Sequence, residues 1–307
     1  MQLAQIGLGA TFVLKNPKEK SAGRLVLEQY QVYKKPSFLD YLRGGLELNM
    51  IVAIDFTGSN GSPKQPTSLH FMNPNAPNQY QMAINSIAQI LLSYDSNQRI
   101  PAFGFGAKTN FNGVKEPTSH CFVLSGNAQE VEACGVEHLM GMYQKALLNV
   151  ELSGPTYFGP LLEETIQLAK GCRQSGSNVY QTLLILTDGE IHDMDKTVEL
   201  IIQGSQLPLS VIIVGVGQAD FSKMNKLDGD GGLYGHNGKK CPRDIVQFVP
   251  FREVGMNGDL LAKQLLAELP GQVVQYMMMV GKPPGQPVPV DVNGMIAKER
   301  EAKNKQV

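Results

Sequence analysis

The chain has 307 residues, of which 42% are hydrophobic and 18% are charged, as expected for a folded globular protein. Its formal net charge is −1 at pH 7 and its 27 lysines and arginines are scattered, which argues against a nucleic-acid partner. The four cysteines show no paired spacing, no apolar run is long enough to span a bilayer, and the N-terminus lacks a convincing secretory leader. These features predict a soluble, cytoplasmic protein.

Residues 1–36 differ from the rest of the chain. Strand-like segments at 10–14 and 24–33 flank a turn rich in lysine, proline and glycine, which predicts a β-hairpin. An isolated hairpin is only marginally stable in water, so we expect this one to be the end of a larger domain. A linker is expected over 37–47, and residues 283–307 are expected to form a flexible tail.

Apolar strands and amphipathic helices alternate over residues 48–282. We expect strands at 50–54, 100–106, 120–124, 180–187, 209–216 and 245–250, and helices at 83–94, 136–148, 159–170, 194–202 and 259–269, the last ended by Pro270. This alternation predicts a doubly wound α/β domain with a mostly parallel sheet that is covered by helices on both faces.

Oxygen-bearing side chains follow the strand at 50–54. Asp55, Thr57 and Ser59 stand at every second position, and the glycines among them allow the tight turn that would bring the three side chains together. Hard cations such as Mg²⁺ prefer oxygen ligands of this kind. The alternative is an ordinary polar turn in which serine and asparagine cap the next helix.

Two further loops carry matching oxygen atoms. Thr156 lies in a loop just before the helix at 159–170, and Asp188 directly follows the strand at 180–187. Ligands of open α/β sheets bind beyond the carboxyl ends of the strands, so we expect both residues to lie near Asp55. The alternative is a metal-free structural site in which Thr156 caps a helix and Asp188 folds its own loop.

The set of Asp55, Thr57, Ser59, Thr156 and Asp188 resembles the metal-ion-dependent adhesion site of von Willebrand factor A domains. That resemblance implies that the five side chains hold Mg²⁺ or Mn²⁺, with Ca²⁺ as a further candidate. Waters would complete the coordination of the ion, and an acidic side chain of an intracellular partner protein would replace one of them. Such a site captures an acidic side chain of a protein and need not perform chemistry.

Longer stretches are similar to the copine family in particular, namely residues 37–45, 53–61 and 243–252. Copines carry two calcium-binding C2 domains before their A-type domain, so the hairpin at 1–36 would be a C-terminal remnant of the second one. C2 domains bind calcium through clustered aspartates, but no aspartate precedes Asp40. The calcium signalling and calcium-dependent phospholipid binding of the family, at the plasma membrane, are therefore expected only where intact C2 domains are present. We expect this chain to be a fragment, a truncated member or an incomplete gene model.

The alternative function is that of an enzyme. A Mg²⁺-dependent phosphotransferase could use Asp55 as its nucleophile, because that aspartate also follows a buried strand. Such enzymes usually need a second carboxylate two residues later, where this chain has Thr57. Lys64 is a weak candidate for the lysine that they also need, and a loop histidine such as His192 is more often a surface residue than a proton shuttle. We therefore predict that the protein is not an enzyme.

Overall fold

The structure is a computed structural model that describes residues 11–18, 20–26, 28, 35–95, 97–189, 191–229, 232–254 and 257–287. The chain divides into two compact units, Met1–Ser37 and Phe38–Val307, which we describe separately. Every helix in the described ranges is too short or too polar to span a membrane.

The first unit contains an antiparallel hairpin of β1 (Thr11–Lys15) and β2 (Ser21–Val26), which confirms the predicted hairpin. Its turn is closed by Asn16, whose side-chain oxygen accepts hydrogen bonds from the main-chain N–H groups of Lys18 and Lys20. The second strand begins three residues earlier than predicted, and residues 29–33 of that prediction lie outside the described residues. The assignment of this hairpin to a C2 domain stays a prediction.

The second unit is built on a seven-stranded sheet in the order β12-β11-β10-β3-β4-β7, with β8 also paired to β4. Five of these strands are parallel, and β7 and β8 run antiparallel to β4. The strands are β3 (Glu47–Asp55), β4 (Arg99–Phe105), β7 (Phe122–Val123), β8 (Glu132–Cys134), β10 (Val179–Thr187), β11 (Leu209–Gly215) and β12 (Val246–Pro250). The predicted fold class, an α/β domain built on a mostly parallel sheet, is confirmed.

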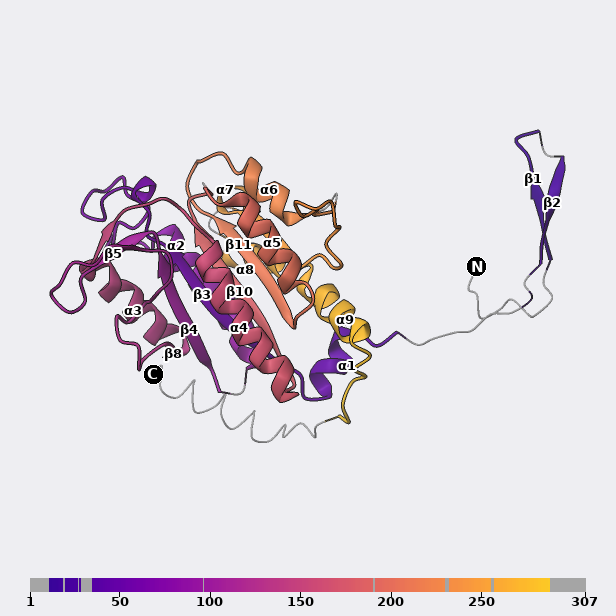
Figure 1. Cartoon of the computed structure of the whole chain (residues 1–307), viewed down its shortest axis with the longest axis horizontal. Coiled ribbons are helices and arrows are strands. Elements are labelled where there is room, and N and C mark those ends of the chain that lie inside the picture. The colour runs from indigo at the N-terminus through magenta and orange to yellow at the C-terminus, as the bar shows by residue number, and fades with distance from the viewer. Residues whose placement is uncertain are drawn as a thin grey trace. The chain divides into compact units, whose positions relative to one another are not determined.

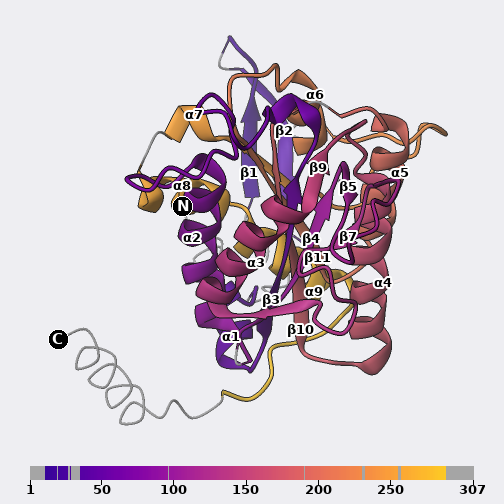
Figure 2. The same cartoon turned by 90° about the vertical axis from the view of Figure 1, so that its left-hand side faces the viewer.

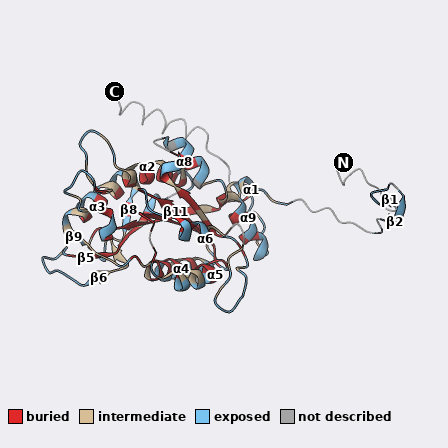
Figure 3. Ribbon diagram, turned by 90° about the horizontal axis from the view of Figure 1, so that it is seen from above, coloured by how far each residue is buried: buried red, intermediate tan, exposed pale blue. Residues whose placement is uncertain are grey.

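Helices cover both faces of this sheet, and the three layers are visible from above in Figure 3. The alternation along β3 explains the two cores: Met50 and Val52 pack on one side of the sheet, and Ile51 and Ala53 pack on the other. The first core is covered by α1 (Phe38–Arg43), α2 (Gln79–Leu91), α3 (Gly135–Asn149), α7 (Phe251–Val254), α8 (Gly258–Leu265) and α9 (Leu269–Met279). The second is covered by α4 (Gly159–Ser175), α5 (Met194–Gly204) and α6 (Ser222–Asp228), with α4 and α5 in front of the sheet in Figure 1.

Two segments differ from the sequence predictions in an informative way. The segment predicted to be a linker contains α1, whose Tyr41 is buried and donates a hydrogen bond to the Lys282 carbonyl. Pro270 was expected to end the helix at 259–269. Instead α8 ends at Leu265, and Pro270 lies in the first turn of α9, a position where its missing N–H group costs nothing.

A second, three-stranded sheet in the order β6-β5-β9 lies beside the predicted metal loops. It consists of β5 (Ala107–Thr109), β6 (Thr118–Ser119) and β9 (Val150–Leu152). Immediately after β9, Ser153 forms a parallel bridge to Thr57 and accepts a hydrogen bond from the Gly58 N–H. This small sheet therefore connects the end of α3 to the loop that follows β3.

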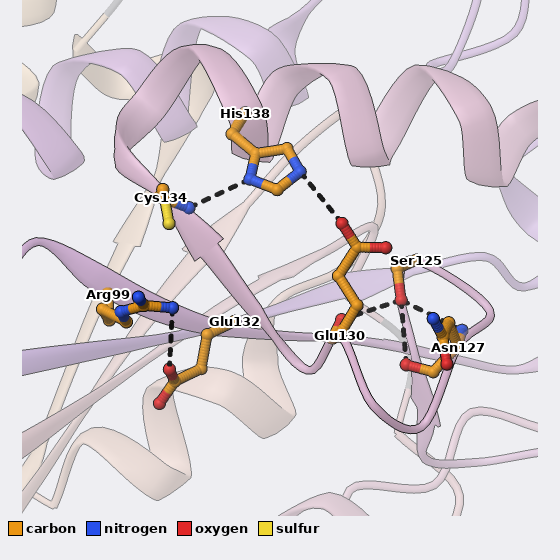
Figure 4. A network of polar contacts seen from close by, with 7 residues as sticks. All are labelled: Arg99, Ser125, Asn127, Glu130, Glu132, Cys134 and His138. Carbon is orange, nitrogen blue, oxygen red and sulfur yellow. Dashed lines mark hydrogen bonds and ion pairs between the residues drawn. The ribbon is translucent and has the colours of Figure 1, made fainter.

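At the opposite end of α3, a polar network holds β8 against the sheet (Figure 4). The main-chain N–H of Cys134 donates to Nδ1 of His138 at 3.1 Å, and Nε2 of His138 lies 3.4 Å from the carboxylate of Glu130. Arg99 on β4 pairs with Glu132 on β8 at 3.8 Å. These half-exposed contacts fix the start of α3, and we assign them a structural role.

Candidate metal centre

Asp55 is the last residue of β3 and is completely buried. One carboxylate oxygen, Oδ1, accepts hydrogen bonds from the main-chain N–H of Thr57 at 2.8 Å and from its hydroxyl at 2.6 Å. The other, Oδ2, accepts from the hydroxyl of Thr187 at 2.7 Å. The carboxylate is therefore held rigidly by its own loop and by the neighbouring strand β10.

The hydroxyl groups of the Asp55 loop form a chain that leads to the surface. Thr57 Oγ1 lies 3.0 Å from Ser59 Oγ, and Thr57 is buried whereas Ser59 is exposed. Asn60 supports the turn from inside, because its buried amide donates to the Thr57 carbonyl and its oxygen accepts from the Tyr80 hydroxyl. A site built on this loop is thus open to solvent at Gly58 and Ser59.

Asp188 follows β10, the strand that pairs in parallel with β3, and only 5% of its surface is exposed. Burial and the nearby carboxylate of Asp188 together raise the pKa of Asp55 to about 7. Two carboxylates in one buried site repel each other, so a divalent cation that neutralises both would relieve this cost. The electrostatics of the pair therefore fit a bound divalent ion.

Thr156 lies in the second predicted loop and is 2% exposed. Its main-chain N–H donates to Nδ1 of His192 at 3.3 Å, and its carbonyl accepts from the His192 N–H at 3.0 Å. Both of these hydrogen bonds to described residues come from the main chain of Thr156, which leaves its hydroxyl outside the contacts that hold the loop. No hydrogen bond among those residues joins Thr156 to Asp55, so its place in the ligand set stays a prediction.

The predicted donor set consists of two carboxylates and several hydroxyls. Within the described ranges, no three or more histidine, cysteine, aspartate or glutamate side chains gather in one place as metal ligands. Oxygen-only ligands with two negative charges suit Mg²⁺ and Mn²⁺ better than zinc, which prefers nitrogen and sulfur. The residues present fit a hard divalent cation.

Sequence reasoning missed the residue that supports this site from below. His70 is completely buried, with its Nε2 at 2.8 Å from the Asp55 carbonyl oxygen and its Nδ1 at 2.8 Å from the Tyr143 hydroxyl. Its ring stacks between Tyr80, at a centroid distance of 4.3 Å, and Phe56, at 5.2 Å. Burial lowers the pKa of His70 to about 3, so the ring is neutral. No spacing in the sequence marks this histidine, because its partners are distant along the chain.

Thr187 was not among the predicted site residues, although a sequence signal existed for it. It directly precedes Asp188, and β10 pairs in parallel register with β3, Leu186 lying opposite Ile54. A threonine at the end of that strand is therefore placed to bond the aspartate that ends its neighbour. The hydroxyl of Thr187 orients Asp55 and also accepts a hydrogen bond from the Gly189 N–H.

Of the two groups considered for a phosphotransferase, one is engaged with a neighbouring loop and the other is exposed. His192 is engaged with the main chain of Thr156 and thereby positions that loop. Lys64 is exposed and forms no hydrogen bond or ion pair with any described residue, Asp55 included. The contacts of Asp55 come from hydroxyl, amide and main-chain groups, an environment that orients a carboxylate for binding.

A family model described as Copine matches residues 68–285. The match covers more than half of the chain, and the chain belongs to the copine family. Two curated relatives from Arabidopsis thaliana are similar to it. Protein BONZAI 1 is 42% identical over 284 residues, and Protein BONZAI 2 is 43% identical over 257 residues. These alignments cover 92% and 83% of this chain but 47% and 43% of the relatives, so the chain spans about half of their length.

Solved structures give more distant matches. Manganese-loaded TRAP protein of Plasmodium vivax has a TM-score of 0.43 at 16% identity, over 72% of this chain and 73% of that protein. The SpRpn10 VWA domain has a TM-score of 0.36 at 13% identity, over 80% of this chain and 100% of that domain. We draw no functional conclusion from likenesses this distant. Membership of the copine family itself supports a protein-interaction module.

Proposed function

We propose that this chain is a metal-dependent protein-binding module that captures acidic segments of partner proteins inside the cell. In this proposal Asp55, Thr57, Ser59, Thr156 and Asp188 hold Mg²⁺ or Mn²⁺, with Ca²⁺ as the third candidate. The observation that carries it is the buried pair of carboxylates, Asp55 and Asp188, beneath a chain of hydroxyls that ends at an exposed serine. A bound divalent ion would offer the partner's carboxylate a positive charge in an otherwise acidic site.

The protein's own residues keep the site ready for binding. Thr57 and Thr187 fix one carboxylate oxygen of Asp55 each, so little side-chain freedom is lost when an ion arrives. His70 holds the main chain of Asp55 in place. None of these groups is placed as an acid or a base toward a substrate, which supports a binding role and argues against the phosphotransferase alternative.

The metal step is tested by isothermal titration of Mg²⁺ and Mn²⁺ into the purified chain, beside the variants Asp55→Asn and Asp188→Asn. We expect the parent to bind and each variant to bind at least about tenfold more weakly. Asp220→Asn is the matched control, because Asp220 is exposed and only caps Ser222. Absence of both binding heat and thermal stabilisation in the parent would overturn the metal site.

The partner step is tested with a library of short peptides that each contain one fixed glutamate and randomised flanking residues. A second library with glutamine at the fixed position serves as the control. We expect the parent to retain glutamate peptides in Mg²⁺ and to release them in EDTA, and to ignore the glutamine library. Equal retention of the two libraries would contradict carboxylate capture.

We infer a membrane role only for longer relatives, through the copine resemblance. In them this module would act beside calcium-dependent binding of phospholipid at the plasma membrane, as part of a calcium response in the cytoplasm. No aspartate precedes Asp40 in this sequence. We therefore expect the 307-residue chain not to sediment with phosphatidylserine vesicles when Ca²⁺ is added. Calcium-dependent sedimentation of this chain would show that it carries a lipid site of its own.

A further inference from the structure

A groove with a volume of about 950 Å³ lies beside the predicted metal site, between the Asp55 loop, the end of α3 and β9. Figure 2 shows α3 and β9 in this part of the second unit. We call it the α3 groove and define it by five apolar side chains and one lysine: Lys64, Met72, Leu147, Leu148, Val150 and Leu152. Gly58 and Gly61 of the metal loop line its near end.

The apolar lining of the α3 groove is accessible to solvent. The side chain of Leu148 is 86% exposed, the highest value among the exposed large hydrophobic residues of the described chain. Met72, Leu147, Val150 and Leu152 are each half-buried. A single exposed leucine is ordinary on a protein surface, but apolar side chains that converge on one hollow are characteristic of binding sites.

The charges around the α3 groove favour an acidic occupant. Lys108 and Lys115 both pair with Glu151, the lysine–glutamate distance being 3.5 Å for Lys108. Lys64 lines the groove and forms no ion pair with any described residue. The glutamate that also lines it, Glu151, is neutralised by two lysines, which leaves the lining with an unpaired positive charge. A positive rim attracts acidic segments and repels basic ones.

The α3 groove is also continuous with the predicted metal site. Gly58 lies between Thr57 and Ser59 in the sequence, and Gly61 follows two residues later, so the loop that would hold the ion forms one wall of the groove. Alternate residues of an extended peptide lie about 6–7 Å apart on one face. One short segment can therefore place a carboxylate at the ion and an apolar side chain in the groove.

We propose that the α3 groove is a specificity pocket for the partner protein: it binds an apolar side chain that lies a few residues from the carboxylate captured by the metal. The occupant is thus an acidic segment that carries a leucine-like residue at a fixed distance from its glutamate or aspartate. This inference rests on the proposed function. It adds the side-chain pattern by which one acidic segment is chosen over another.

The glutamate peptide library tests this pattern directly. In Mg²⁺ we expect the parent to enrich leucine, isoleucine, methionine or phenylalanine at one fixed offset from the glutamate. Leu148→Glu should remove that preference and weaken the best peptide about tenfold. Because Leu148 is so exposed, the variant should fold and bind Mg²⁺ like the parent. Leu260→Glu is the matched control on α8, where Leu260 is 40% exposed and does not line the groove.

The charge step is tested with Lys64→Glu. We expect weaker peptide binding that depends less on salt concentration, because the replaced lysine attracts the peptide through long-range electrostatics. Lys263→Glu, an exposed lysine on α8, should leave binding unchanged. Equal effects of the two substitutions would show that only the overall charge matters and would contradict a local role for Lys64.

Other outcomes of these experiments distinguish the groove proposal from the proposed metal-dependent capture on which it rests. Glutamate peptides enriched without an apolar preference, or with a preference that survives Leu148→Glu, would overturn the groove proposal and leave the metal-dependent capture intact. Failure of the parent to bind Mg²⁺ in titration would overturn the proposed function and the groove proposal together. Self-association that disappears on Leu148→Glu, measured by sedimentation, would assign the groove to a second copy of this chain.

Discussion

Nε2 of His70 lies 2.8 Å from the main-chain carbonyl oxygen of Asp55, and this contact supports the predicted metal site from inside the protein. A carbonyl oxygen only accepts hydrogen bonds, so Nε2 carries the proton and Nδ1 accepts one from the Tyr143 hydroxyl. The neutral ring thus connects the end of β3 to α3. Water cannot replace either hydrogen-bond partner of His70, because Asp55, His70 and Tyr143 are all buried.

We predict that His70→Phe lowers the free energy of unfolding by about 3 kcal/mol at neutral pH. The phenyl ring keeps the stacking on Phe56 and Tyr80. It removes the donor to the Asp55 carbonyl and the acceptor of the Tyr143 O–H group, although the Tyr143 oxygen still accepts from Asn78. Urea unfolding of the parent and the variant measures the difference.

The same pair of proteins tests the protonation state of His70. Burial lowers its pKa from 6.5 to about 3, so below pH 6.5 the unfolded chain binds a proton that the native protein does not. The parent therefore loses stability as the pH falls through this range, by about 2 kcal/mol near pH 5, whereas the variant lacks this contribution. The gap between parent and variant should narrow by that amount. A gap that stays constant would mean that His70 titrates normally in the folded protein.

Gly106 offers a test of the Thr57 position that does not alter a predicted ligand. Its φ is +79°, and a Cβ atom added there would overlap the methyl group of Thr57. We predict that Gly106→Ala weakens Mg²⁺ binding about tenfold or more and destabilises the fold by about 3 kcal/mol. Titration calorimetry and urea unfolding provide the two measurements.

The matched control is Gly113→Ala. Gly113 has nearly the same φ, +74°, but open space where its Cβ would lie. Gly113→Ala should lower the free energy of unfolding only by the backbone strain of about 1–2 kcal/mol and should leave Mg²⁺ binding unchanged. Identical metal affinity in the two variants would show that Thr57 is not part of the site.

A further prediction about stability concerns Arg243, which is only 5% exposed. It packs over the rings of Tyr180 and Tyr276 at 5.9 and 5.4 Å. It also donates five hydrogen bonds, to the hydroxyl of Tyr180 and the carbonyls of Ser205, Leu207, Leu209 and Gln272. We predict that Arg243→Lys lowers the free energy of unfolding by about 3 kcal/mol, because an ammonium group has only three donors and lacks the planar fork.

Arg252→Lys is the control for this substitution. Arg252 is exposed, donates one hydrogen bond to the Ala219 carbonyl and lies over the Phe221 ring at 4.8 Å. Its replacement should cost about 1 kcal/mol or less in the same urea experiment. If both substitutions cost the same, the buried network around Arg243 does not contribute as argued.

The four free cysteines should differ in reactivity. Burial raises the pKa of the Cys121 thiol to about 12, whereas Cys134 is exposed at the start of α3. We predict that Ellman's reagent modifies Cys134 well before Cys121 at mildly alkaline pH, because only the thiolate reacts. Cys134→Ser should remove the fastest phase and Cys121→Ser should leave it unchanged. A fast phase lost in Cys121→Ser would contradict the burial of that thiol.

The sheet and the two aspartates could be predicted because their signals are local. A strand that packs on both faces needs an unbroken apolar run such as residues 50–54. In the structure Met50 packs in one core and its neighbour Ile51 packs in the other. Asp55 and Asp188 follow such runs directly, and parallel neighbours end at the same edge of the sheet. Their proximity follows from topology alone.

The supporting residues could not be predicted, because their signals are not local. His70 contacts Tyr143, which is 73 residues away in the chain, and Arg243 bonds carbonyl groups that every residue possesses. Pro270 was misassigned because proline is equally suited to follow one helix and to begin the next.

The hydrogen bond from Thr187 to Asp55 spans 132 residues of sequence, and this separation has a consequence for synthesis on the ribosome. β3 emerges early but lacks its neighbour β10 until most of the domain has been made. At common elongation rates that interval lasts on the order of ten seconds. During this interval the edge of β3 that later pairs with β10 has no partner strand. A nascent chain that stalled before β10 was made would therefore expose an apolar segment that a chaperone could bind.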